Sequence, residues 1–169
     1  MQRIENACLE KARELLKSGA VTRVLGWKKG EFCYDVEPSV FFGESDLKNF
    51  VYNGFCGANL SKYLVAESKK EGKILVFLKP CDTYSFNQLI KEHRINENNV
   101  YAVAVECQGK LDVRKFREKG VEFIDGIEET IDTVTVNRNK TFPRDDVKLV
   151  KCLVCNKKHV AGEAKIEFE

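Results

Sequence analysis

The chain has 169 residues, which is enough for one domain that buries roughly 70% of its unfolded surface. The 28 Lys and Arg residues are dispersed and nearly balanced by 26 Asp and Glu, which argues against nucleic-acid binding. No apolar run approaches the ~20 residues of a membrane span, and the N-terminus lacks the apolar stretch of a signal peptide. We therefore expect a cytoplasmic protein whose seven cysteines stay reduced and serve metal, cluster or redox chemistry rather than structural disulfides.

The first part of the chain combines helical and strand patterns. Apolar side chains that recur at helical spacing between charged ones predict an amphipathic helix, and Ser18 and Gly19 mark its end. Two β-rich segments on either side of Gly30 predict a hairpin. In chain order, the predicted elements are the helix over 4–17, hairpin strands over 21–27 and 32–36, a short helix ending at 51, and a helix over 58–70.

The middle of the chain contains two fully apolar runs, 73–78 and 100–105, which predict buried strands on either side of a helix over 82–93. A strand, helix, strand unit of this length makes the two strands parallel, most often as neighbours, with a right-handed crossover. The remaining predicted elements are a helix over 111–119, a third short strand over 121–124, a surface strand over 130–136, a polar loop over 137–146 and a cysteine-bearing tail over 147–169.

Together these elements predict an α/β fold: a small, mainly parallel sheet with helices on both faces and a β-rich N-terminal hairpin. We expect a single domain over 1–169, with its core in 45–125 and the cysteine-bearing tail at its C-terminal end.

Cys81 and Cys107 follow the two apolar runs at equivalent places. Parallel strands end at the same edge of a sheet, where open α/β folds bind ligands, and neighbouring strands lie about 4.8 Å apart. The two sulfurs could therefore share one cluster or metal. A thiol at the start of a helix also feels the positive end of the helix dipole, so we expect Cys81 to favour the thiolate that ligates iron or zinc. The alternative is a small buried residue at each strand-to-helix turn.

The most specific local pattern is the pair Cys152 and Cys155, because this spacing lets two thiolates chelate one tetrahedral centre. A redox dithiol and half of a zinc site, completed by His159, are competing interpretations. If the pair closes a site shared with Cys81 and Cys107, residues 147–155 must fold back across the carboxyl edge of the sheet.

The other cysteines give weaker signals. Cys56 lies in a glycine-flanked turn before a predicted helix, and ligation and packing beside Phe55 are equally good interpretations. Cys8 lies on the apolar face of the first helix and Cys33 in a hairpin strand, so we expect both to be structural.

A charged rim accompanies the two edge cysteines and consists of Lys79, Asp82, Glu106 and Lys110. These side chains could tune a cluster or contact a flavin, and Lys79, Asp82 and Glu106 are the candidate cofactor-binding residues. Helix capping is the simpler interpretation and the one we favour.

Four short segments carry a resemblance to a known family. They are Asn53-Gly-Phe-Cys-Gly-Ala-Asn-Leu60, Lys79-Pro-Cys-Asp82, Val105-Glu-Cys-Gln-Gly109 and Lys151-Cys-Leu-Val-Cys155. Their types and order resemble the beta subunits of coenzyme F420-reducing hydrogenases and formate dehydrogenases, which are iron–sulfur electron-transfer proteins. Family members typically continue from the last pair into a ferredoxin-like module, whereas His159 and its neighbours follow here. The expectation is therefore the N-terminal domain of such a subunit without that module.

The resemblance implies a function as well as a fold. Cys81, Cys107, Cys152 and Cys155 match cluster-site cysteines, and Cys56 matches a motif cysteine of less certain role. We expect an electron-transfer subunit or partner of an anaerobic oxidoreductase of the hydrogenase, formate dehydrogenase or heterodisulfide-reductase type. It would bind one [4Fe-4S] cluster, with FAD as a further cofactor, contact catalytic or electron-transfer subunits, and carry out no bond chemistry itself. The alternative is a zinc-binding or metal-free assembly module that keeps the family fold.

Overall fold

The computed structural model describes residues 2–156 and 164–166. Within these residues the main sheet has five strands in the order β2-β1-β3-β4-β8. Its strands are β1 (Arg23–Lys29), β2 (Val36–Phe41), β3 (Ile74–Leu78), β4 (Val100–Val105) and β8 (Ala164–Ile166). β1, β3, β4 and β8 pair in parallel, and β2 adds to one edge in the antiparallel sense. The predicted α/β fold with a mainly parallel sheet is confirmed.

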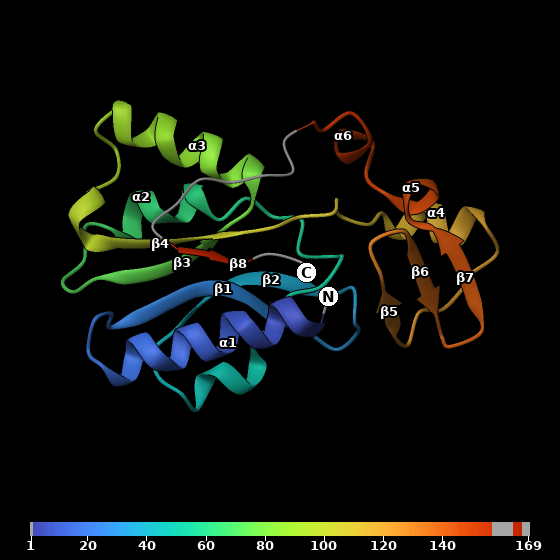
Figure 1. Cartoon of the computed structure of the whole chain (residues 1–169), viewed down its shortest axis with the longest axis horizontal. Helices are drawn as coiled ribbons and strands as arrows, with labels where there is room; N and C mark the ends of the chain where they lie inside the picture. Colours follow the sequence, from blue (N-terminus) through green and yellow to red (C-terminus); the bar gives the residue numbers. More distant parts are fainter. Residues whose placement is uncertain (1, 157–163, 167–169) are drawn as a thin grey trace.

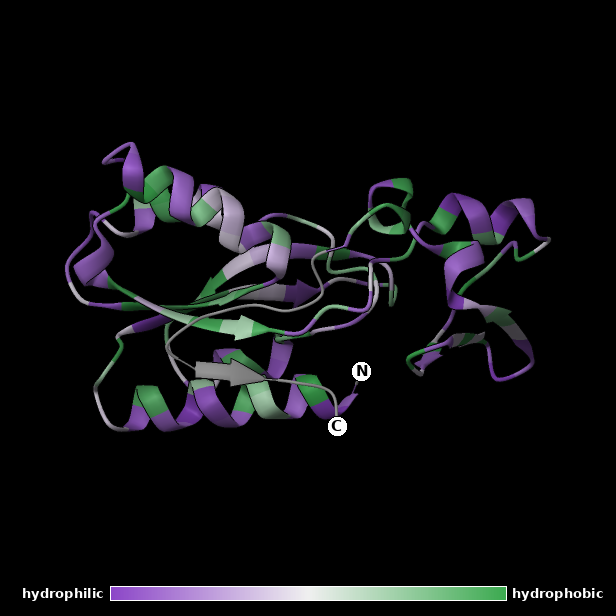
Figure 2. Cartoon of the chain, turned by 45° about the horizontal axis from the view of Figure 1, so that its top comes forward, coloured by the Kyte–Doolittle hydropathy of each residue, from purple (hydrophilic) through white to green (hydrophobic). Residues whose placement is uncertain are grey.

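Helices cover both faces of this sheet, as predicted (Figure 2). α1 (Gln2–Lys17) lies on one face and α3 (Pro80–Lys91) on the other, beside the short α2 (Leu64–Glu67) (Figure 1). Because both faces are covered, all five residues of β3 are buried. α1 is the predicted amphipathic helix, and it buries Ile4, Cys8, Ala12 and Leu15 at helical spacing.

A second sheet lies beside the main one (Figure 1). In the described chain it has three antiparallel strands: β5 (Ile127–Glu129), β6 (Thr133–Val136) and β7 (Lys140–Pro143). It packs with α4 (Val113–Glu118) and α5 (Arg144–Val147) around a hydrophobic cluster separate from the main core. The predicted alternating surface strand over 130–136 is present as the shorter β6, and its alternate residues Val134 and Val136 are buried in this cluster. The predicted loop over 137–146 is wrong, because it contains β7 and most of α5.

The hairpin is confirmed, but its second strand is Val36–Phe41 rather than 32–36. Phe32 and Tyr34 stack on each other in the connecting turn; Phe32 contacts the exposed Phe123, and Tyr34 contacts Phe55 of the second cluster. These aromatic contacts take the segment out of the sheet. Cys33 consequently lies in the turn and not in a strand.

Two further predictions are wrong. The helix over 58–70 is reduced to α2, because the Asn59 side chain accepts from the Ser61 backbone N–H and hydroxyl at 2.9 and 2.6 Å and competes with helix formation. Residues 121–124 form no strand: Val121 and Ile124 instead fill the second cluster from a loop.

The remaining elements are short. They are η1 (Asp46–Asn49), η2 (Ser61–Tyr63), η3 (Glu97–Asn99) and α6 (Val150–Leu153). No helix in the described part of the chain is long and apolar enough to cross a membrane.

Candidate metal centre

A cavity of about 200 Å³ opens at the carboxyl edge of the main sheet, and four cysteines line it. β3 and β4 are parallel neighbours with Leu78 opposite Ala104, so both strands end at this edge. The chain then reaches Cys81 in the first turn of α3 and Cys107 in the loop after β4. The prediction that these two thiols meet at one edge is confirmed. Cys152 and Cys155 line the same cavity.

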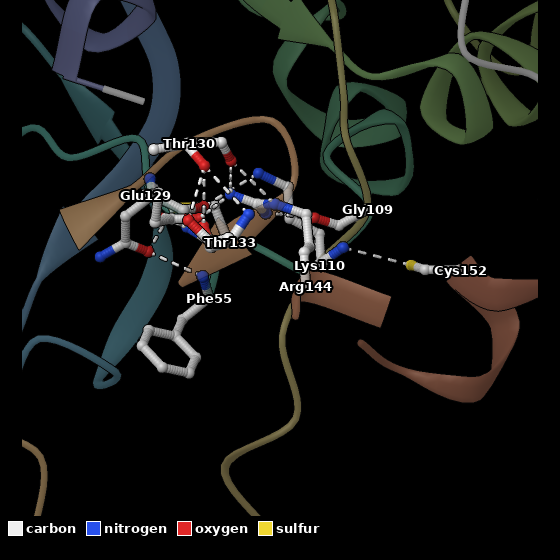
Figure 3. A network of polar contacts seen from close by, with 11 residues as sticks. Phe55, Gly109, Lys110, Glu129, Thr130, Thr133, Arg144 and Cys152 are labelled. Atoms are coloured by element: carbon white, nitrogen blue, oxygen red, sulfur yellow. Dashed lines mark hydrogen bonds and ion pairs between the residues drawn. The ribbon is translucent and has the colours of Figure 1, made fainter. Parts of the chain in front are cut away.

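The returning tail brings the second pair of cysteines to the cavity. The Leu149 backbone N–H donates to the carbonyl of Lys110 at 2.8 Å, and Lys148 forms an antiparallel bridge with Leu111. The Lys110 backbone N–H in turn donates to Cys152 Sγ at 3.4 Å, the contact drawn in Figure 3. Residues 147–155 therefore fold back across the sheet edge, as the shared-site prediction required.

Gly109 permits this close return. Its φ is +92°, in the left-handed region that favours glycine, and a Cβ added there would lie 2.8 Å from Lys148 Cε. The loop after β4 can therefore pass directly beneath the tail.

A buried ion pair holds the loop in place from the side of the second sheet (Figure 3). Arg144 Nη2 lies 2.9 Å from Glu129 Oε2, with both side chains 2% exposed. Arg144 also donates to the carbonyls of Thr130 and Gly109, and Glu129 Oε1 accepts from the Gly54 N–H at 2.7 Å. Sequence analysis missed both residues, because nothing local marks a pair formed between a strand and a distant short helix.

The thiol of Cys81 does not favour the thiolate in the protein without metal. Burial, and then the carboxylate of Asp82, raise its pKa from 9.0 to about 11, although the Lys79 charge opposes the shift. The expectation based on the helix dipole is therefore wrong. The loss of water and the adjacent Asp82 carboxylate disfavour the charged form of the thiol here.

The charged rim consists mostly of satisfied side chains. Asp82 accepts from the Lys79 backbone N–H at 3.2 Å, which confirms the predicted capping role, and its Oδ2 lies 2.7 Å from Lys79 Nζ. Lys79, Asp82 and Lys110 line the cavity, whereas Glu106 does not and accepts from Gln108 Nε2 at 2.9 Å. A flavin contact by Lys79, Asp82 or Glu106 stays a prediction.

Cys56 lies outside the cavity lining and is completely buried in the main core. Its sulfur accepts from the Asn53 N–H at 3.3 Å and contacts the Val51 carbonyl oxygen at 3.7 Å. Burial raises its pKa to about 11, against the opposing charges of Lys110 and Lys79. This environment is that of a packed thiol, and ligation by Cys56 has no geometric support.

The two cysteines expected to be structural also lie away from the cavity. Cys8 is buried in the main core, and the half-buried Cys33 contacts the Ile124 carbonyl oxygen at 3.7 Å. His159, the candidate fourth zinc ligand, lies outside the described residues.

The donor set of the cavity fits an iron–sulfur cluster. Four thiols are the usual ligands of a [4Fe-4S] cluster and are also known for structural zinc. Among the described residues, no three or more His, Cys, Asp or Glu side chains converge at the geometry of a single metal ion. The four cysteines instead line a cavity of about 200 Å³ together with nine other residues.

Comparison with known proteins agrees with the sequence resemblance. No family model matches the chain. Over 97 residues it is 33% identical to the beta subunit of F420-dependent formate dehydrogenase 1 from Methanococcus maripaludis, covering 57% of this chain and 25% of that protein. It is 32% identical over 97 residues to the F420-dependent formate dehydrogenase beta subunit of Methanocaldococcus jannaschii, covering 57% of this chain and 26% of that protein. The matched region thus spans about a quarter of these relatives.

A solved structure shares the fold. A chain of the F420-reducing [NiFe] hydrogenase complex from Methanosarcina barkeri superimposes with a TM-score of 0.63 at 15% identity, covering 89% of this chain and 62% of that one. The predicted resemblance is therefore confirmed in sequence for the beta subunits of F420-dependent formate dehydrogenases, and the hydrogenase chain shows that the fold is shared.

Proposed function

We propose that Cys81, Cys107, Cys152 and Cys155 bind one [4Fe-4S] cluster, through which the chain transfers electrons as a subunit or partner of an oxidoreductase. The observation that carries the proposal is the convergence of these four cysteines, from three separate segments, on one cavity. Cys56, Cys8 and Cys33 lie elsewhere, so the thiols divide into a group at the sheet edge and a packed group.

The size of the cavity favours a cluster over a single zinc ion. A zinc ion would draw four sulfurs to about 2.3 Å from one point. The four thiols here line a cavity of about 200 Å³, which has room for a group larger than one ion, although the same donors would accept either group. The competing proposal, a zinc-binding or metal-free assembly module, is therefore the less favoured one.

The surrounding residues supply what a bound cluster needs for outer-sphere electron transfer. The cluster would accept one electron, and the chain would set its reduction potential through burial, charge and hydrogen bonds to sulfur. The Lys110 backbone N–H already donates to Cys152 Sγ, and Lys79 and Lys110 line the cavity beside the thiols.

The names of the relatives suggest the setting of this function. We propose partners among the catalytic or electron-transfer subunits of a cytoplasmic, anaerobic complex, because the matched relatives are beta subunits of F420-dependent formate dehydrogenases. FAD stays a second cofactor that the resemblance implies.

Single cysteine variants test the proposed ligands. We expect Ser in place of Cys81, Cys107, Cys152 or Cys155 to abolish assembly of the cluster, because each removes a thiolate. Iron per chain, measured after anaerobic purification, gives the result. Cys33→Ala and Cys56→Ala should keep their iron. Full iron in Cys81→Ser, or loss of iron in Cys56→Ala, would show that the ligand set is wrong.

A further inference from the structure

Two buried lysines flank the thiol cavity, and they differ in how their charge is balanced. Lys79 Nζ lies 2.7 Å from Asp82 Oδ2, with both side chains at most 1% exposed. Lys110 is 2% exposed, and its Nζ donates to the Asn53 carbonyl at 2.9 Å and lies 3.9 Å from the centre of the Tyr52 ring. Among the residues that the structure describes, the Lys110 ammonium contacts no carboxylate.

An unbalanced buried charge is unfavourable unless an anion lies nearby. The carbonyl and the aromatic ring stabilise the Lys110 ammonium in part, but neither carries a net charge. The residue is also tied to two of the proposed ligands. Its backbone N–H donates to Cys152 Sγ at 3.4 Å, and the hydroxyl of Tyr52, whose ring the ammonium contacts, donates to the carbonyl of Glu106, the neighbour of Cys107.

A four-thiolate [4Fe-4S] cluster would provide the missing negative charge. We propose that Lys110 raises the reduction potential of this cluster by holding an uncompensated positive charge beside it. The inference rests on the proposed function and assigns Lys110 a tuning role that does not require it to be a ligand. Lys79 contributes less, because Asp82 balances its charge.

The electron balance of the step is simple. The cluster and its four thiolates accept one electron from a one-electron donor, such as a reduced flavin or the dithionite of the test, and become one unit more negative. No bond forms or breaks and no proton moves. A fixed positive charge favours the more negative state, and salt screens it little because it is buried.

Redox titration with dithionite, followed by the electron paramagnetic resonance of the reduced cluster, tests this role. We expect Lys110→Met and Lys110→Gln to lower the ratio of reduced to oxidised cluster at least tenfold, measured at the midpoint potential of the wild type. A tenfold change corresponds to a fall of about 59 mV in the midpoint potential. Gln can still donate to the Asn53 carbonyl, so it separates charge from hydrogen bonding. Lys110→Arg should stay within threefold of wild type. Lys91→Met, at the exposed far end of α3, is the matched control and should not change the ratio.

The outcomes separate the tuning role from the cluster itself. Unchanged midpoints in both neutral variants at full iron content would overturn the role of Lys110 and leave the cluster standing. A wild-type protein without iron would overturn the cluster and this inference together. If the neutral variants lose iron while Lys110→Arg assembles with the wild-type midpoint, the need for a positive charge is supported. If the Arg variant also loses iron, the role is packing and the inference fails.

Discussion

The seven cysteines differ in how well the sequence predicts their positions in the fold. Cys81 and Cys107 were predictable because each follows an apolar strand, and parallel strands end at a common edge. Cys152 and Cys155 were predictable from their chelating spacing. Cys56 was not, because a turn before a helix can lie at either edge, and here its sulfur is buried in the core.

The raised pKa of Cys81 gives a prediction for the iron-free protein. Only the thiolate reacts with iodoacetamide, and burial and Asp82 raise the pKa to about 11 in the folded state from 9.0. The thiolate fraction at pH 8 is therefore lower in the folded chain than in the unfolded one. We expect the alkylation rate of Cys81, followed by peptide mass spectrometry, to rise with pH and reach half its maximum near pH 11.

The same measurement in urea is the control, since the unfolded thiol should reach half its maximal rate near pH 9. A midpoint at or below pH 9 in the folded protein would mean that the helix end does stabilise the thiolate.

At the level of elements, the β3–α3–β4 unit was predicted well, whereas the second sheet was not. β3 and β4 are apolar runs with helices on both sides, and the pattern of a buried strand is local. The second sheet depends on distant contacts, including the Glu129–Arg144 pair and the ring contact between Phe116 and Phe142. Such contacts leave no periodic signal in the sequence.

The Arg144–Glu129 pair should matter for stability. We expect Arg144→Met to lower the free energy of unfolding by about 3–5 kcal/mol, because it leaves the Glu129 carboxylate buried without its partner. Urea unfolding of iron-free protein gives the value. Lys119→Met breaks the exposed ion pair with Asp146 and should cost less than about 1 kcal/mol. Equal losses in the two variants would show that the buried pair has no special role.

In the part of the chain that the structure describes, two hydrophobic clusters meet at the loops around the cavity. Phe55 belongs to the cluster of the second sheet and the adjacent Cys56 to the main core, so a single turn joins both. The loop after β4 likewise runs from Cys107 at the cavity to Leu111 in the second cluster. The site thus depends on how both parts pack. The expectation of a single domain over 1–169 stays a prediction.

The central claim is that this arrangement holds one iron–sulfur cluster. Iron and acid-labile sulfide content of the full chain, purified without oxygen, tests it most directly. The four-cysteine cavity predicts brown protein with about four irons and about four sulfides per chain. Colourless protein with about one zinc, or with no metal, would contradict the claim.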